Sequence, residues 1–207
     1  MLSVHNVLQM SCLCLLLQYL IVGVSAAPLN EFSGQYGYLS ADQTFQQFLT
    51  NNLEFIDKIK DKSQGLRNIF CRDLQLCKEE ELTVLKEQMH LDPPLLDHCH
   101  SSSYNLEKCL NQVQSGLQTY HSRFPILEKV LSRNTVAVSR LRRDIEDLQS
   151  NFRQQMEHMS IEPVNYPSAE VSFPTPLHEQ AGGYLLLCNL QRSLETLTRA
   201  LRPFLRQ

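Results

Sequence analysis

The sequence lacks the short motifs by which many enzymes are recognised. It contains no G-x-S-x-G, no phosphate-binding P-loop and no dinucleotide-binding glycine fingerprint. His178 and Glu179 begin like the helix of a zinc protease, but Gly182 stands where the second histidine ligand is required. The formal net charge is only −3 at pH 7, and nothing in the sequence indicates a nucleic-acid-binding surface. We therefore expect a binding protein with no enzymatic activity, no cofactor and no nucleic-acid partner.

The first 26 residues also lack something: they contain no Asp, Glu, Lys or Arg. The stretch from Val7 to Val24 is mostly apolar, and Val24 and Ala26 occupy the −3 and −1 positions of a signal-peptidase site. Three polar residues dilute the apolar run and no basic stop-transfer cluster follows it, which argues against a membrane anchor. We expect a signal peptide over residues 1–26, a secreted single domain over residues 27–207, and no membrane insertion.

The cysteines beyond this segment are Cys71, Cys77, Cys99, Cys109 and Cys188. An oxidising extracellular compartment favours disulfides over thiolate chemistry, and no C-x-x-C redox motif is present. Zinc sites usually space their cysteines more closely than C-x5-C and C-x9-C. The stretch DHCH (97–100) resembles a metal site, but its cysteine is better used in a disulfide. The sequence predicts the pairs Cys71–Cys77 and Cys99–Cys109, with Cys188 a free, buried thiol and no metal site.

These pairs have geometric consequences for the chain. Six residues of continuous helix rise about 9 Å, beyond the usual Cα separation of a disulfide, so the chain must turn between Cys71 and Cys77. Cys99 must likewise fold back beside the first turn of the helix that contains Cys109. On the chain-entropy model the two short loops contribute about 2.4 and 2.8 kcal/mol to stability. We interpret both disulfides as structural.

Four segments show the 3.6-residue periodicity of amphipathic helices. Their apolar positions run from Phe45 to Phe70, from Leu106 to Phe124, from Val138 to Met159 and from Leu177 to Leu201. The first helix is expected to begin near Ser40 or Thr44, both in capping-box sequences. Asn134 is the predicted cap of the third, and Thr175 of the fourth, where Pro176 suits the first helical position. The stretch KEEELTVLKEQMHL after Cys77 also reads as helical.

Glycine and proline leave two details of these helices open. Gly65 makes the end of the first helix the least defined boundary, and Pro203 should end or kink the fourth. Gly182 and Gly183 inside the fourth helix each cost about 1 kcal/mol relative to alanine. Either the close approach of another chain element or simple tolerance near a helix start would explain this pair.

The connections between the helices predict the topology. Those after the first and third helices are long and contain prolines, in LDPPLLDHC (91–99) and IEPVNYPSAEVSFPTP (161–176), whereas the second and third helices are joined near residues 131–133. Long, short and long connections are typical of an up-up-down-down bundle. No β-pattern or internal repeat stands out. The sequence therefore predicts an all-α, long-chain four-helix bundle with two long crossover loops and two local disulfides.

Charged residues outside the apolar stripes are the remaining candidates for function. Asp144 and Asp147 share a face of the third helix, with an arginine four residues before each. Glu54 lies outside the stripe of the first helix, with Lys58 four residues further on. Solvated faces with weak pairs at i,i+4 spacing explain these residues equally well.

Several stretches carry a resemblance to a known family. They are C-x5-C ahead of EEL (80–82), C-x9-C entering the second helix, CLNQVQSGLQTY (109–120), QQME (154–157) and AGGYLLLCNLQRSLETLTRALR (181–202). The chain resembles the granulocyte colony-stimulating factor family of long-chain four-helix cytokines, nearly without gaps from about Phe48 to the last helix. It departs from mammalian members in having Asn52 in place of an unpaired cysteine and no proline after Cys77.

The resemblance implies a secreted haematopoietic cytokine. Such a protein binds and dimerises a class I cytokine receptor of the granulocyte colony-stimulating factor receptor type, as a monomeric ligand in a 2:2 complex, and stimulates granulocyte proliferation and differentiation. The resemblance further implies one receptor-contact surface at Glu54, Asp144 and Asp147. A second surface is implied at Glu81 and Leu177.

Two other interpretations stay open at this point. The first is another helical cytokine of the interleukin-six type. The second, from a different class, is a secreted lipid-binding protein with amphipathic helices. Local disulfides and proline-containing crossovers favour a fixed bundle over helices that spread on lipid.

Overall fold

The chain divides into two units, Met1–Ala41 and Asp42–Gln207. The computed structural model describes residues 42–100, 103–164, 166 and 171–205, all of them in the second unit. The expected signal peptide and Ser40 lie outside the described residues.

Four long helices make up most of the described chain: α3 (Gln43–Leu74), α5 (Leu106–Val130), α6 (Thr135–His158) and α7 (Pro176–Leu201). The shorter elements are the 3-10 turns η1 (Glu80–Leu82), η2 (Asp97–Cys99), η3 (Ser132–Asn134) and η4 (Arg202–Phe204), and the helix α4 (Thr83–Met89). Within the described ranges every regular element is helical, which confirms the all-α prediction.

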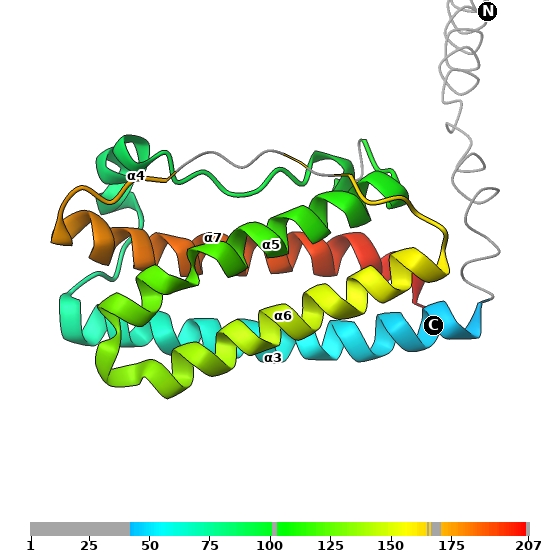
Figure 1. Ribbon diagram of the computed structural model, residues 1–207, viewed down its shortest axis with the longest axis horizontal. Helices are drawn as coiled ribbons and strands as arrows, with labels where there is room; N and C mark the ends of the chain where they lie inside the picture. The colour runs from blue at the N-terminus through cyan, green and yellow to red at the C-terminus, as the bar shows by residue number, and fades with distance from the viewer. Residues whose placement is uncertain (1–41, 101–102, 165, 167–170, 206–207) are drawn as a thin grey trace, which may run out of the picture. The chain divides into compact units, whose positions relative to one another are not determined.

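The four long helices form a bundle in which neighbours are antiparallel (Figure 1). Helices α3 and α5 run in one direction, while α6 and α7 run in the other. Helix α3 packs against α6 and α7, and α5 packs against the same two, so α6 and α7 lie across the diagonal from one another. The long connections precede α5 and α7, and η3 forms the short link between α5 and α6. The predicted up-up-down-down topology is confirmed.

The apolar stripe expected for α3 is buried over its whole length, from Phe45 to Phe70. It includes two polar residues whose hydrogen bonds are satisfied within the bundle, as burial requires. Asn52 Nδ2 donates to the carbonyl of Phe48 (2.8 Å) and its Oδ1 accepts from Asn151 Nδ2 of α6 (2.8 Å). Ser63 Oγ donates to the carbonyl of Leu187 in α7 (3.4 Å). These side chains therefore link α3 to both of its neighbours.

The helix ends agree with the sequence at most positions. Thr175 caps α7, with its Oγ1 accepting from the amide of His178 (3.3 Å), and α7 ends at Leu201, two residues before Pro203. Helix α3 begins at Gln43, between the two expected positions, but the expected cap was wrong. Asp42 is the N-cap, because its Oδ1 accepts from the amide of Thr44 (2.8 Å), which places Thr44 inside the first turn.

The two consecutive glycines of α7 are explained by close packing. A Cβ atom on Gly182 would lie 2.3 Å from Cε1 of Phe173, and one on Gly183 would lie 2.9 Å from Cζ of Phe70. Both separations are far below contact distance, so a side chain at either position would displace an aromatic ring. Of the two readings left open above, the close approach of other chain elements holds.

Both local disulfides are present, as predicted. The Cα atoms of Cys71 and Cys77 are 4.4 Å apart, and those of Cys99 and Cys109 are 4.8 Å apart. Helix α3 ends at Leu74, and Gln75 adopts a left-handed conformation with φ 59°, so the chain turns inside the first disulfide loop as expected.

Candidate functional site

The first candidate surface lies where α3 and α6 run side by side, and it contains Glu54, Asp144 and Asp147. We call it the α3–α6 surface. Two contacts fix the register of the helices: Asn151 Nδ2 donates to Asn52 Oδ1, and Lys62 Nζ lies 2.5 Å from Asp144 Oδ2. Asp147 lies between these cross-links along α6, one turn from Asp144, and its side chain is exposed. The antiparallel packing thus brings acidic residues from distant parts of the sequence to one side of the bundle.

Lysines of α3 neutralise two of the three carboxylates on this surface. Glu54, Lys58 and Lys62 follow one another at four-residue spacing, so they form a stripe along α3. Lys58 Nζ bonds to Glu54 Oε1 (2.7 Å), and this hydrogen bond, with the charge of Lys58, lowers the pKa of Glu54. Lys62 pairs with Asp144, whose side chain is only 14% exposed. In the described part of the chain no ion pair holds Asp147, which makes it the available carboxylate of the surface.

Lys62 is the residue of this surface that the sequence did not reveal. The expectation from helix spacing was a weak pair between Asp144 and the arginine at position 140. The structure instead pairs Asp144 with Lys62 on another helix, 82 residues away in the sequence. No local pattern predicts such a pair, because it depends on the register between α3 and α6.

The second candidate surface lies at the end of the bundle where α4 packs against the start of α7 (Figure 1). We call it the α4–α7 surface; it contains Glu81 in η1 and Leu177 in the first turn of α7. Glu81 is exposed and pairs with Lys78 (3.2 Å), and Leu177 is 53% exposed. The ring of His178 lies 3.1 Å from Gln88 Oε1 and so links α7 to α4.

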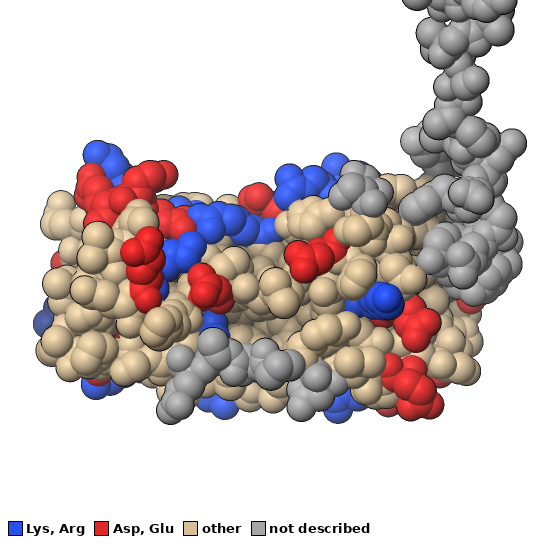
Figure 2. All heavy atoms as spheres, turned by 90° about the horizontal axis from the view of Figure 1, so that it is seen from above, with Lys and Arg blue, Asp and Glu red and all other residues tan. Residues whose placement is uncertain are grey.

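The α4–α7 surface contains both exposed apolar side chains and charged side chains. Val84 of α4 is 66% exposed, an apolar residue that sequence periodicity did not single out. Figure 2 shows acidic and basic side chains gathered at the end of the molecule where α4 lies. The sequence KEEEL (78–82) supplies charges of both signs there. An apolar residue surrounded by charges is typical of a protein-contact surface.

His98 and Cys99 of the stretch DHCH (97–100) have partners within the protein. His98 donates its amide to Gln112 Oε1 (3.0 Å), and its ring lies 3.3 Å from the carbonyl of Ser103. Cys99 itself is in the disulfide with Cys109. Among the described residues no group of His, Cys, Asp and Glu side chains is arranged to hold a metal ion. In the same part of the chain, none of the helices combines the length and the apolar character that crossing a bilayer demands.

The fold and its surfaces together define a class of protein. Four long helices in up-up-down-down order, joined by two long crossovers, are the architecture of the helical cytokines. Residues 56–202 match the model of the family described as granulocyte colony-stimulating factor. The chain therefore belongs to the granulocyte colony-stimulating factor family, and it is a secreted cytokine and not an enzyme.

Individual relatives agree with this assignment. The chain is 39% identical to myelomonocytic growth factor of Gallus gallus over 184 residues, which cover 87% of this chain and 88% of the relative. It is 33% identical to granulocyte colony-stimulating factor of Canis lupus familiaris over 161 residues, covering 77% of this chain and 92% of the relative. Identity to the Homo sapiens factor is 31% over 162 residues, covering 76% and 78% of the two chains.

Proposed function

We propose that this cytokine binds and dimerises a class I cytokine receptor of the granulocyte colony-stimulating factor receptor type, and so stimulates granulocyte proliferation and differentiation. Membership of the family supports a cytokine receptor as the partner. In the proposal a monomeric ligand, secreted after removal of residues 1–26, contacts one receptor chain through the α3–α6 surface. It contacts a second receptor chain through the α4–α7 surface, in a 2:2 complex.

The observation that supports this proposal best is the separation of the two surfaces. Helix α6 carries Asp144 and Asp147, whereas α4 packs on α7, which lies across the diagonal of the bundle from α6. Two receptor chains can therefore bind to one ligand without competing for the same residues. Such an arrangement allows a monomeric ligand to bring receptors together.

The chemistry of the α3–α6 surface supports recognition of a basic receptor patch. Asp147 offers a carboxylate on a rigid helix, and a charge pair that is desolvated at an interface is worth much more than the same pair on a free surface. Lys62 acts against this attraction, because it places a positive charge beside Asp144. Neutralising Asp147 and neutralising Lys62 should therefore change binding in opposite directions.

The test is receptor association measured by stopped flow across a salt series. Asp147→Asn should slow the association rate and flatten its salt dependence, because exposed charges are screened within about 8 Å at physiological ionic strength. Lys62→Met should accelerate association. Asp147→Asn should alter the free energy of unfolding by no more than about 0.5 kcal/mol. Lys62→Met should lower it by about 1–3 kcal/mol, because it leaves the largely buried carboxylate of Asp144 without its partner. Glu146→Gln is the matched control, since Glu146 lies on α6 but faces His121 of α5.

Two outcomes would contradict the proposal. If Asp147→Asn and Glu146→Gln have the same association rate as the unchanged protein at every salt concentration, Asp147 is only a solvated charge. If the purified protein fails to drive proliferation of cells that carry the receptor, the assignment of the receptor type is wrong.

A further inference from the structure

The segment from Cys77 to Leu91 is too irregular to hold its shape alone. Its regular structure consists of η1 and the seven-residue helix α4, which ends at Met89 and is followed by His90 with φ 52°. Isolated helices shorter than about 12 residues are marginal in water, so α4 requires support from the rest of the protein. Glu81 belongs to this segment, so the same support decides where its carboxylate points.

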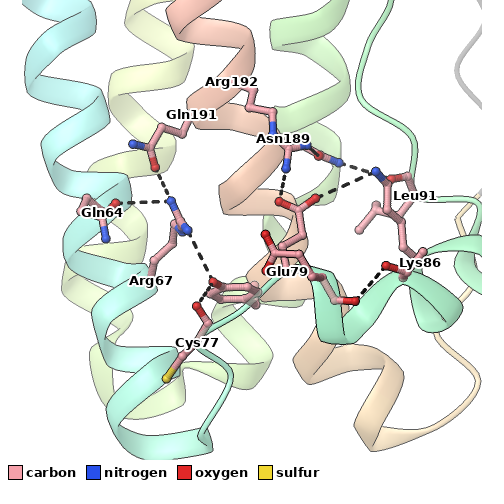
Figure 3. A network of polar contacts seen from close by, with 12 residues as sticks. Gln64, Arg67, Cys77, Glu79, Lys86, Leu91, Asn189, Gln191 and Arg192 are labelled. Carbon is pink, nitrogen blue, oxygen red and sulfur yellow. Dashed lines mark hydrogen bonds and ion pairs between the residues drawn. The ribbon is translucent and has the colours of Figure 1, made fainter.

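The first support acts at the start of the segment, directly after the disulfide. Tyr184 of α7 donates its hydroxyl hydrogen to the carbonyl of Cys77 (2.8 Å). Arg67 of α3 holds this tyrosine from the other side: its Nη2 lies 3.4 Å from the phenolic oxygen, and its guanidinium lies 5.5 Å from the ring centroid. Arg67 is itself fixed by Gln191 Oε1 (2.6 Å) and by Gln64 Oε1 (3.3 Å) (Figure 3). The hydroxyl of Tyr184 is thus aimed at one backbone carbonyl.

The second support acts two residues before Glu81. Glu79 forms an ion pair with Arg192 of α7, and its other oxygen lies 4.0 Å from Lys86 Nζ on α4 (Figure 3). The side chain of Glu79 is only 21% exposed, so this pair is better shielded from water than the pairs of Glu54 and Glu81. Glu79 therefore ties α4 and α7 together at one point.

The third support acts at the end of the segment. Asn189 of α7 is buried, and its Nδ2 donates to the carbonyl of Leu91 (3.3 Å). Its Oδ1 accepts from Arg192 Nη1 (3.3 Å), so the second and third supports are joined. The segment is consequently held near its start, at Cys77 and Glu79, and at its end, at Leu91, by residues of a single helix.

We propose that Tyr184, Asn189 and Arg192 of α7 are positioning residues for receptor recognition, which set the conformation of the segment 77–91 and with it the orientation of Glu81. This inference rests on the proposed function of the α4–α7 surface. It assigns a role in receptor binding to residues that act through the segment and not through contact with the receptor. Their loss should therefore weaken binding at this surface and leave the α3–α6 surface unaffected.

The test is a charge-reversal cycle on the ion pair between Glu79 and Arg192. All variants carry Asp147→Asn, so that receptor binding reports mainly on the α4–α7 surface. Arg192→Glu places two carboxylates together, and it should weaken binding about fivefold and speed amide hydrogen exchange over residues 78–90. Adding Glu79→Arg should restore most of the affinity and the protection. Arg199→Glu is the matched control, because Arg199 lies on the same helix and bonds only to Thr196 within the described chain.

Tyr184→Phe provides a second measurement that removes a single hydroxyl group. It should speed exchange at the start of the segment without unfolding the bundle, and Tyr120→Phe, which removes another buried hydroxyl, should not. A receptor affinity that falls equally in Arg192→Glu and in the double reversal would overturn the positioning role, since it would mean that Arg192 contacts the receptor itself. Unchanged exchange in all variants would overturn it as well.

The variant Glu81→Gln separates this inference from the proposed function. If Glu81→Gln weakens binding but Arg192→Glu does not, the surface is correct and the positioning role is wrong. If Glu81→Gln keeps full affinity while Arg192→Glu loosens the segment, the receptor surface is wrong. In that case α7 supports the segment for stability alone, and the positioning role in recognition is wrong too.

Discussion

The two surfaces proposed to contact the receptor are built in different ways. The α3–α6 surface lies on helices of 32 and 24 residues, whose backbones are held by their own hydrogen bonds and by their buried stripes. The α4–α7 surface lies partly on a segment with a seven-residue helix, whose shape depends on side-chain contacts to α7 and on a disulfide. Distant substitutions should therefore disturb the α4–α7 surface far more readily than the α3–α6 surface.

The largest expected effects come from removing a disulfide, first the one that closes the loop between α3 and the segment 77–91. Replacing both Cys71 and Cys77 by serine should lower the free energy of unfolding by about 2.4 kcal/mol, because the unfolded chain regains the loop entropy. It should also weaken binding through Glu81 and leave binding through Asp147 unchanged. Urea unfolding and receptor binding measure the two effects.

If binding weakens equally at both surfaces, the expected difference between them is wrong, since the disulfide would then support the whole bundle. A matched control is the Cys99–Cys109 pair, replaced in the same way. Its expected loss is about 2.8 kcal/mol by the same model, and it closes the crossover ahead of α5 and not the segment that contains Glu81.

A smaller effect is expected from two glycines. Gly183→Ala should destabilise the protein by about 1–2 kcal/mol, because the new methyl group would lie 2.9 Å from Cζ of the buried Phe70 beneath the second surface. Gly65→Ala, on α3, meets no atom within 4 Å and should stabilise by about 0.5–1 kcal/mol through helix propensity. The midpoint temperatures of thermal unfolding should thus shift in opposite directions in the two variants. Shifts of the same sign would show that movement of the Phe70 ring relieves the close packing at Gly183.

The smallest effect under ordinary conditions is an alkaline loss of stability from groups buried around α7. Burial raises the pKa of Tyr120 and the pKa of Cys188 above their ordinary values of 10.0 and 9.0. The folded chain therefore keeps two protons that the unfolded chain releases. Their contribution is fully present below about pH 9 and declines as the pH rises further, toward the higher pKa values of the folded chain.

Urea unfolding between pH 7 and pH 10.5 tests this expectation. The combined variant Tyr120→Phe and Cys188→Ala should show a flatter alkaline decline than the unchanged protein. Glu54→Gln should leave the alkaline limb as it is, because the lowered pKa of Glu54 makes its contribution disappear only as the pH falls below about 4.5. If the free energy of unfolding falls equally steeply with rising pH in the combined variant, the alkaline loss of stability originates from groups other than Tyr120 and Cys188.

Most of the fold follows from the sequence because helices are local structures. Apolar spacing predicted the buried faces of all four long helices, and connection lengths predicted their order. The cap of α3 was mispredicted because Ser40, Asp42 and Thr44 are all good capping residues within five positions, and only the backbone decides among them.

The candidate surfaces were predictable to different degrees for the same physical reason. Helix phase alone places Asp147 and Glu54 outside the apolar stripes. The pair of Lys62 with Asp144 and the pair of Glu79 with Arg192 span 82 and 113 residues of sequence. Such pairs depend on how the elements pack, so no local pattern contains them. Arg192 was the one available signal, because α7 carries few charged residues.

The buried thiol of Cys188 makes it possible to measure openings of the folded protein by thiol labelling. Cys188 is unpaired, and its position on α7 keeps it out of reach of a thiol reagent while the helix is docked. Labelling at this position can proceed only through openings that detach α7 or unfold the chain. Its rate therefore equals the population of open molecules multiplied by the intrinsic reactivity of a free thiol, as long as closing outpaces the reagent. A single cysteine thus reports the fraction of molecules in which α7, the helix that supports the α4–α7 surface, is detached or unfolded.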